Sequence, residues 1–413
     1  MTSRASLASP AAISVTAQKV NKQHESNPSS SLSVEHLHTL QQLRAALPEW
    51  QDLYAASGVF NPFINPLWVL AWIEHYVDNE RLDVLFIRAN NELVGVAPFY
   101  RSATRALRGL SPVRMQLLGN DGKDDLTELT EPLLLPQRSR AILRTIVAEI
   151  TAEAHWDWLE LPLSAEQGWI ETQWWPMDGR GRHPRFVALH KATVASVILN
   201  LDPAEAAVPL KRNMRRILRH RRNQLERQQA VVEVQRVDGQ DQLADAIRIL
   251  CELHSARSAM QNVPKHPDML TTDRSRAFLA SAITAMANAG DAAIYVLHID
   301  HHAVAVQLVL IANSCYYLTL SGIDPTAWQL SPLTMLTSSV IDDAKTRGAK
   351  RVNLSTGPNT AKLAWSESLE FHQYFLIVRR APMSSLRFAA YWQARSINRF
   401  LHEYRQQRRQ GGK

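Results

Sequence analysis

A chain of 413 residues is too long for one ordinary hydrophobic core, so we expect about two domains. Hydrophobic residues make up 46% of it and charged residues 21%, which is the composition of a globular protein and excludes a largely disordered one. The formal net charge of +7 favours anionic partners, such as a phosphorylated cofactor, nucleic acid or an acidic lipid surface.

The first half of the chain predicts a leader followed by an α/β domain. Residues 1–33 are rich in Ser, Ala and Asn without apolar periodicity, and we expect them to be disordered. An N-terminal domain over 34–190 should follow. Its expected elements are a helix that begins at Asn65, a hairpin of strands 82–88 and 93–100, a strand at 113–118, a helix at 138–153 and a strand at 156–161.

The second half, over 191–382, repeats this order of elements. A hairpin, a strand, a helix and a strand are expected at 292–299 with 303–312, 316–321, 333–346 and 351–355. Duplicated domains explain the repeat most simply, although chance alternation of helices and strands gives the same order. We therefore expect two α/β domains packed face to face, each with its own central mixed sheet.

Two predicted helices concentrate the positive charge. The first is expected over 210–229, where eight basic residues stand against one acid, Glu226. It is either a landing surface for a phosphate-rich partner or a solvated helix with extended arginines. The second, over 383–413, repeats aromatic residues every three or four positions. Its aromatic stripe either packs on the second domain or makes peripheral contact with an anionic membrane.

Several classes of protein are disfavoured by what the sequence lacks. It contains no Walker A loop, no dinucleotide-binding Gly-x-Gly-x-x-Gly after a strand and no Gly-x-Ser-x-Gly elbow. Adjacent His301 and His302 point in opposite directions at a hairpin tip, and the other histidines are scattered, so we expect no metal. The two cysteines, Cys251 and Cys315, predict no disulfide framework, and no signal peptide or membrane-spanning run is evident. We therefore expect a cytoplasmic protein.

The stretch 321–336 is the best candidate for a binding site. A strand ends there, a loop crosses, and a helix begins with Ser331 as N-cap and Pro332 in its first turn. The free N–H groups and positive end of such a helix suit a pyrophosphate. Lys362 follows the next strand, where a cation could neutralise a phosphate or a developing oxyanion. We assign cofactor binding to the residues at this helix start, which are Gln329, Leu330, Ser331, Leu333 and Thr334.

Short motifs in and around this stretch carry a family resemblance. Their order is G-I-D-P from Gly322, S-P-L-T-M-L from Ser331, R-G-A-K-R-V-N-L-S-T-G from Arg347 and K-L-A-W from Lys362. This order resembles the second half of the CelD-like GNAT acyltransferases, which are often tied to cellulose and exopolysaccharide production. N-P-F from Asn61 and other short motifs of the first half agree, so the resemblance covers roughly residues 45–380.

The resemblance implies an α/β fold of two tandem GNAT-like acyltransferase domains, with the donor site in the second. It also implies an N-acyltransferase that moves an acyl group, expected to be acetyl, from acetyl-CoA or another acyl-CoA to an amine by direct attack. The acceptor would be a small molecule or a glycan precursor. Asp324, Tyr316 and Tyr317 are the candidates for handling the amine proton near the donor loop. Lys362 matches the active-site lysine of the related Fem-type peptidyltransferases, so we expect it to be catalytic.

One departure from the family pattern leaves the donor open. Single-domain GNAT enzymes bind coenzyme A through an Arg/Gln-x-x-Gly-x-Gly/Ala turn, whereas 329–334 contains neither glycine. Fem-type enzymes carry two GNAT domains and use aminoacyl-tRNA as donor, and the basic helix over 210–229 could grip a tRNA backbone. A third possibility is a non-catalytic accessory protein of polysaccharide biosynthesis, whose donor loop is a relic.

Overall fold

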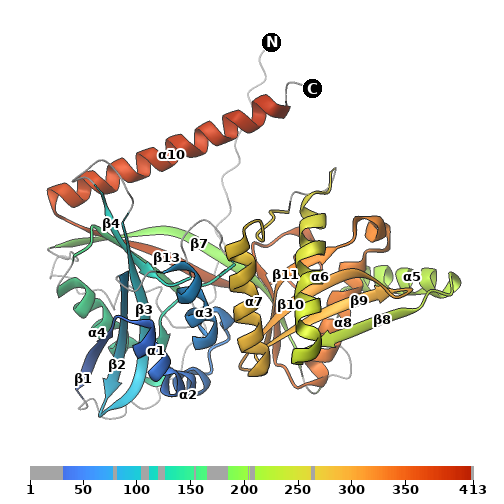
Figure 1. Cartoon of the computed structure of the whole chain (residues 1–413), viewed down its shortest axis with the longest axis horizontal. Coiled ribbons are helices and arrows are strands. Elements are labelled where there is room, and N and C mark those ends of the chain that lie inside the picture. The colour runs from blue at the N-terminus through green and yellow to red at the C-terminus, as the bar shows by residue number, and fades with distance from the viewer. Residues whose placement is uncertain are drawn as a thin grey trace. The chain divides into compact units, whose positions relative to one another are not determined.

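The computed structural model describes residues 31–77, 81–103, 111–119, 126–152, 155–164, 185–202, 204, 210–261 and 266–410. Most of the leader predicted over 1–33 lies outside these residues, and the first strand begins at Leu32. Residues Leu32–Lys413 form one unit. Figure 1 shows its helices and strands in chain order.

The first half of the unit contains the predicted helix, hairpin, strand, helix and strand, within a few residues of their expected positions. Asn65 caps the predicted helix through its side chain, which accepts a hydrogen bond from the N–H of Leu67. The elements are β1 (Leu32–Leu37), α1 (Leu40–Ala45), α2 (Leu47–Ser57), η1 (Pro62–Ile64), α3 (Pro66–Tyr76), β2 (Leu82–Ala89), β3 (Glu92–Ala103), β4 (Val113–Leu117), β5 (Leu133–Leu134), η3 (Pro136–Arg138), α4 (Ser139–Ala152), β6 (Trp158–Ser164) and β7 (Phe186–Asn200).

The second half confirms its predicted elements in the same way. The hairpin turns at Asp300 and His301, which both have positive φ, as the tight turn between two twisted strands requires. The elements are α5 (Arg212–Arg227), β8 (Val232–Val237), α6 (Gln240–Ser258), α7 (Asp273–Asn288), β9 (Ala292–Ile299), β10 (His302–Ala312), β11 (Cys315–Ile323), η6 (Pro325–Leu330), α8 (Pro332–Thr346), β12 (Arg351–Thr356), α9 (Thr360–Leu363), β13 (Ser368–Arg379) and α10 (Pro382–Gln410).

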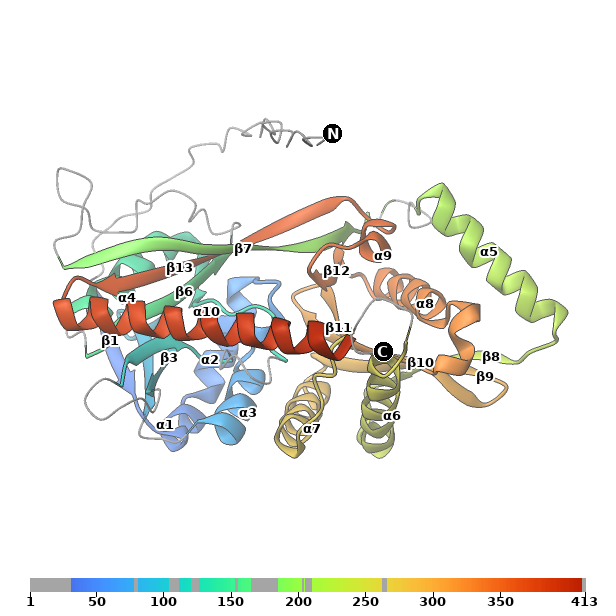
Figure 2. The same ribbon diagram turned by 90° about the horizontal axis from the view of Figure 1, so that it is seen from above.

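All described strands belong to one mixed sheet. The order is β1-β2-β3-β4-β6-β13-β7-β12-β11-β10-β9-β8, and β5 pairs with β3. Each half supplies an antiparallel run that ends in a parallel pair, which is β4 with β6 in the first half and β11 with β12 in the second. Between these pairs lie β13 and β7, side by side and antiparallel (Figure 2).

The expectation of two face-to-face domains with separate sheets is wrong, although the mixed α/β fold is confirmed. The halves join edge to edge because β13 of the second half pairs with β6 of the first, while β7 pairs with β12. The local sequence patterns predicted no strand at β7 or β13, and without these two strands the predicted elements form two separate sheets. The division into 34–190 and 191–382 stays a prediction, and its boundary falls inside β7.

Aromatic side chains also join the two halves on one side of the sheet. The Trp68 ring of α3 lies 5.0 Å from the Phe278 ring of α7, in an edge-to-face arrangement. The Phe63 ring meets the Tyr317 ring of β11 in the same way at 5.1 Å. One hydrophobic core therefore contains residues of both halves.

The C-terminal helix α10 packs its first aromatic residues onto the sheet. Phe388, Tyr391 and Trp392 contact a small buried cluster that includes Trp158 of β6, whose ring lies 4.9 Å from that of Tyr391. Packing therefore accounts for this part of the aromatic stripe, and the contacts include the first half of the chain. The membrane interpretation of the helix stays a prediction. No helix of the described part of the chain combines the length and apolarity that a membrane span needs.

A glycine sets how closely α6 approaches β11. A Cβ atom on Gly322 would lie 2.5 Å from the backbone N of His254 and the backbone C of Leu253. Backbone atoms of a helix cannot rotate away as a side chain can, so the short approach requires glycine. This packing brings the end of α6 over the C-terminal part of β11.

We expect Gly322→Ala to destabilise the fold by about 1–3 kcal/mol, because α6 must move away from the sheet. Urea unfolding followed by circular dichroism measures the change. Gly239→Ala, at the N-cap of the same helix, is the control, since nothing lies within 4 Å of a Cβ there. A Gly322→Ala variant as stable as this control would contradict the close approach.

Candidate functional site

The parallel strands β11 and β12 separate soon after they begin. They pair only where Cys315–Tyr317 lie beside Arg351–Asn353, although β11 continues to Ile323 and β12 to Thr356. In β12 the register against β7 shifts between Asn353 and Thr356, and Ser355 has a φ of 74°. A bulge of this kind redirects neighbouring backbone and side-chain groups. The result is an opening between the two strands.

A carboxylate from the first half of the chain fills this opening. Glu128 lies in the segment between β4 and β5, and its Oε1 accepts a hydrogen bond from Thr319 Oγ1 at 2.9 Å. Its Oε2 accepts four, from Tyr317 Oη at 2.8 Å, from Ser355 Oγ, and from the N and Oγ1 of Thr356, both at 3.1 Å. Glu128 thus bridges β11 and β12 where they no longer bond to each other.

Lys362 lies at the same opening. The side chain of Asn359 caps α9 by accepting a hydrogen bond from the N–H of Lys362, which fixes this short helix after β12. The Lys362 Nζ donates to the carbonyl oxygen of Thr356 at 2.5 Å. Burial lowers the pKa of Lys362, the charge of Arg257 lowers it further, and the negative charge of Glu128 opposes both. The site therefore pairs a carboxylate with a partly desolvated amine.

The end of α6 closes the opening with basic groups. Arg257 Nη1 donates to Ser321 Oγ at 2.6 Å, and burial lowers the pKa of this guanidinium. His254 Nδ1 lies 3.0 Å from the carbonyl oxygen of Ser321, while its Nε2 accepts from the N–H of Met269. These two bonds fix the tautomer of His254 with the proton on Nδ1, and they give the ring a structural role.

His266 faces the same groups and has spare hydrogen-bonding capacity. Its ring lies 5.0 Å from that of His254. Burial, together with the charges of Arg257 and His254, lowers the pKa of His266 to about 4, so its imidazole is neutral at pH 7. Its Nε2 is buried and has no hydrogen-bond partner among the described residues.

Of the predicted catalytic residues, the structure brings Tyr317 and Lys362 together around Glu128. Asp324 lies seven residues beyond Tyr317, which is about 23 Å along an extended strand. Its carboxylate caps η6 by accepting hydrogen bonds from the N–H and hydroxyl of Thr326. Sequence analysis missed Glu128, Arg257 and His266, and no motif marks them.

The predicted cofactor-binding residues lie around the start of α8. Gln329 and Leu330 end η6, while Leu333 and Thr334 belong to the first turn of α8 after Pro332. Ser331 occupies the N-cap position, but its side chain makes no capping bond, so the expected side-chain cap is wrong. Its left-handed φ of 54° and its N–H bond to the carbonyl of Trp328 close η6 instead. Donor binding at this loop stays a prediction.

The corresponding opening of the first half contains an ion cluster. β4 and β6 pair in parallel over Arg114–Gln116, and the buried Glu160 of β6 lies beside them. Lys191 Nζ donates to Glu160 at 2.7 Å, and Arg114 lies 3.6 Å away. The Lys191 ammonium also sits over the ring of Trp392 from α10. These contacts occupy the first opening, so the second is the candidate site.

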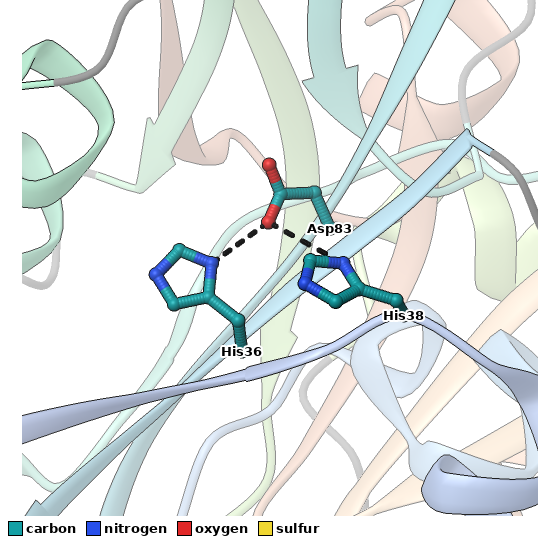
Figure 3. A group of neighbouring side chains, drawn as sticks. All are labelled: His36, His38 and Asp83. Atoms are coloured by element: carbon teal, nitrogen blue, oxygen red, sulfur yellow. Dashed lines mark hydrogen bonds and ion pairs between the residues drawn. The ribbon is translucent and has the colours of Figure 1, made fainter.

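One group of side chains near the start of the chain could hold a metal ion. His36, His38 and Asp83 offer ligand atoms within 4.8 Å of one another (Figure 3). His36 Nδ1 lies 3.0 Å from Asp83 Oδ1, and its Nε2 lies 3.2 Å from Glu149 Oε1. Burial lowers the pKa of His36, but the hydrogen bonds to these two carboxylates outweigh it and raise the pKa overall. Protons therefore compete with any metal for this ring.

The raised pKa of His36 predicts a pH-dependent contribution to stability. Protonated His36 stabilises the folded state below its ordinary pKa of 6.5, and this contribution is lost as the pH rises through the folded-state pKa. We expect His36→Gln to lower the melting temperature more at about pH 5.5 than at about pH 8.5. His38→Gln, at the residue directly after β1, is the control. An equal loss for His36→Gln at both pH values would contradict the pairing of protonated His36 with Asp83 and Glu149.

Comparison with known protein families finds a match in the second half of the chain. Residues 212–363 match a family model described as an acetyltransferase (GNAT) domain. No curated protein sequence matches the chain. The match contains α5, the opening between β11 and β12, α8 and Lys362.

Solved structures resemble the chain over most of its length. A conserved protein of unknown function from Bacteroides thetaiotaomicron is 14% identical and has a TM-score of 0.51. The alignment covers 84% of this chain and 100% of that protein. The C-terminal domain of a putative lysylphosphatidylglycerol synthetase from Agrobacterium fabrum is 13% identical, with 84% and 96% coverage and a TM-score of 0.46. FemX is 10% identical, with 82% and 96% coverage and a TM-score of 0.46.

At these identities the likeness concerns the fold alone. The mixed sheet with two repeated sets of elements is the fold that the chain shares with the Bacteroides protein. The residues that match the family model include β11 and β12, the parallel strands that separate in the second half. Over residues 212–363 the chain is therefore similar to a GNAT-type acetyltransferase domain.

Proposed function

We propose that the protein is an N-acyltransferase with its reaction centre at Glu128, between β11 and β12. The observation that carries the proposal is that Thr356, in the opening between β11 and β12, bonds to both side chains: its N–H donates to Glu128, and its carbonyl oxygen accepts from Lys362. The two residues come from different halves of the chain, so neither half holds the site alone. The finer resemblance to CelD-like proteins, and a role in polysaccharide biosynthesis, belong to the same proposal.

The hydrogen bonds of Glu128 give its two carboxylate oxygens different roles in the proposed reaction. Oε2 accepts four hydrogen bonds and is saturated, whereas Oε1 accepts one, from Thr319. Oε1 therefore keeps the capacity to accept an N–H of an amine and then its proton. Lys362, whose Nζ donates to the carbonyl oxygen of Thr356, supplies the cation for a developing oxyanion.

The proposed reaction is a direct transfer. The amine nitrogen attacks the acyl carbonyl carbon, and a C–N bond forms while the carbonyl oxygen takes up negative charge near Lys362. The bond to the leaving sulfur or oxygen of the donor then breaks, and the carbonyl is restored as an amide. The proton lost by the nitrogen passes to Glu128 and finally to the leaving group.

Glu128→Gln tests the proton acceptor, because the amide keeps the shape of the side chain but cannot take the proton. With acetyl-CoA and a panel of primary amines, we expect release of free thiol to fall by about 100-fold or more in Glu128→Gln. We expect a similar fall in Lys362→Ala, with little change in melting temperature. Lys350→Ala, an exposed lysine of the same half, should retain full activity. Unchanged thiol release by a folded Glu128→Gln would contradict the proposed centre.

A second candidate donor is aminoacyl-tRNA, and α5 is the observation that favours it. Six of its arginines are exposed, namely Arg212, Arg215, Arg216, Arg219, Arg222 and Arg227. Lys211, just before this helix, donates to the carbonyl oxygen of Leu363, the residue after Lys362. The basic helix thus begins next to the proposed centre, where a phosphate-rich donor would lie.

Binding experiments separate the donors. If the donor is tRNA-borne, tRNA should shift the protein in a mobility assay, and the replacement of Arg219 and Arg222 by Ser should weaken binding and its salt dependence. If the donor is acyl-CoA, calorimetry should detect acetyl-CoA or a longer acyl-CoA, and the two replacements should leave that binding unchanged. Coenzyme A binding without turnover of any amine would favour a non-catalytic accessory protein.

A further inference from the structure

A cavity adjoins the proposed centre. Its volume is ≈ 250 Å³, and its lining includes Asn61 and Glu131 from the first half and Arg351, Glu370 and His372 from the second. Tyr317 forms part of the same wall, while its hydroxyl bonds to Glu128. One side chain therefore separates the cavity from the carboxylate of the proposed centre.

Glu131 has an unsatisfied hydrogen-bond acceptor at this cavity. It is 3% exposed, and its Oε1 accepts a hydrogen bond from Asn61 Nδ2 at 2.9 Å. Its Oε2 is buried without a hydrogen-bond partner among the described residues. A buried carboxylate oxygen without a donor is costly, so the site favours a ligand that brings one.

The charges on the opposite wall are already paired. Arg351 Nη1 lies 3.0 Å from Glu370 Oε2, and His372 Nε2 lies 3.5 Å from Glu370 Oε1. Burial would raise the pKa of Glu370, but the nearby His372 and the charge of Arg351 outweigh burial and lower the pKa. The Arg351 guanidinium also stacks on the ring of Phe60, 3.8 Å from its centroid. No described cation pairs with Glu131, so the cavity offers an unpaired carboxyl group to a cationic ligand.

We propose that this cavity selects an acceptor with a second cationic nitrogen, which pairs with Glu131 while the reacting amine reaches Glu128 past Tyr317. The substrate class is a small diamine or an amino compound with a guanidinium group. This inference rests on the proposed function for the reacting amine. The role of Glu131 is to position the acceptor, and it takes no part in bond making.

The test compares ligands with two charged ends to a ligand with one. Isothermal titration calorimetry uses the full chain with diaminopropane, diaminobutane, diaminopentane and aminobutylguanidine, each against butylamine. We expect at least one of the four to bind about 10-fold or more tightly than butylamine, and Glu131→Gln to abolish that difference. The bound diamine should also raise the melting temperature of the unmodified protein but not of Glu131→Gln. Glu252→Gln on the exposed face of α6 is the matched control.

The outcomes separate this inference from the proposed function. If none of the four ligands binds more tightly than butylamine, or if Glu131→Gln keeps the preference, the inference is wrong even when thiol release from acetyl-CoA is observed. If the preference depends on Glu131 but no donor supports transfer, the cationic site stands and the proposed acyltransferase fails. Glu128→Gln should keep the preference for two charged ends while it loses turnover.

Discussion

β7 and β13 lie antiparallel along the whole length of β13, and their backbone hydrogen bonds connect the parallel pair of one half to that of the other. Since neighbouring strands keep a fixed spacing, this connection sets where the two openings lie relative to each other. It also holds the segment of the first half that carries Glu128 against β11 and β12. The candidate site exists only while the two halves share this sheet.

The two openings between parallel strands, one in each half of the chain, contain different side chains. In the first half, Glu160 is neutralised by Lys191 and covered by α10, so its charge serves the fold. In the second, Glu128 is held by hydroxyl and N–H donors, and one of its oxygens retains capacity for a further donor. The same strand geometry thus supports a closed ion cluster in one place and an accessible carboxylate in the other. Chemistry depends here on which side chains enter the opening, more than on the sheet itself.

Local signals made much of the fold predictable from the sequence. Asn65 and Pro66 mark a helix start, and the tight turn at Asp300 marks a hairpin, because each signal acts over a few residues. The pairing of β7 with β13 joins segments far apart in sequence, which no local pattern encodes. Lys362 was found through its short motif, whereas Glu128 contacts Tyr317 from 189 residues away and carries no motif. Ser331 is a residue type that often caps helices. Its backbone is left-handed, however, and it closes η6 without a side-chain cap for α8.

The pairing of β13 with β6 of the first half also has a consequence for biosynthesis. Ribosomes make the chain from its N-terminus, so β6 emerges roughly two hundred residues before β13, the strand that covers its edge. During that interval the first half has an unpaired edge with exposed backbone groups, which is a template for aggregation. Translation must therefore pass β13 before this edge closes, and a nascent chain that has not reached β13 would depend on chaperones in a way that a protein with two self-contained sheets does not.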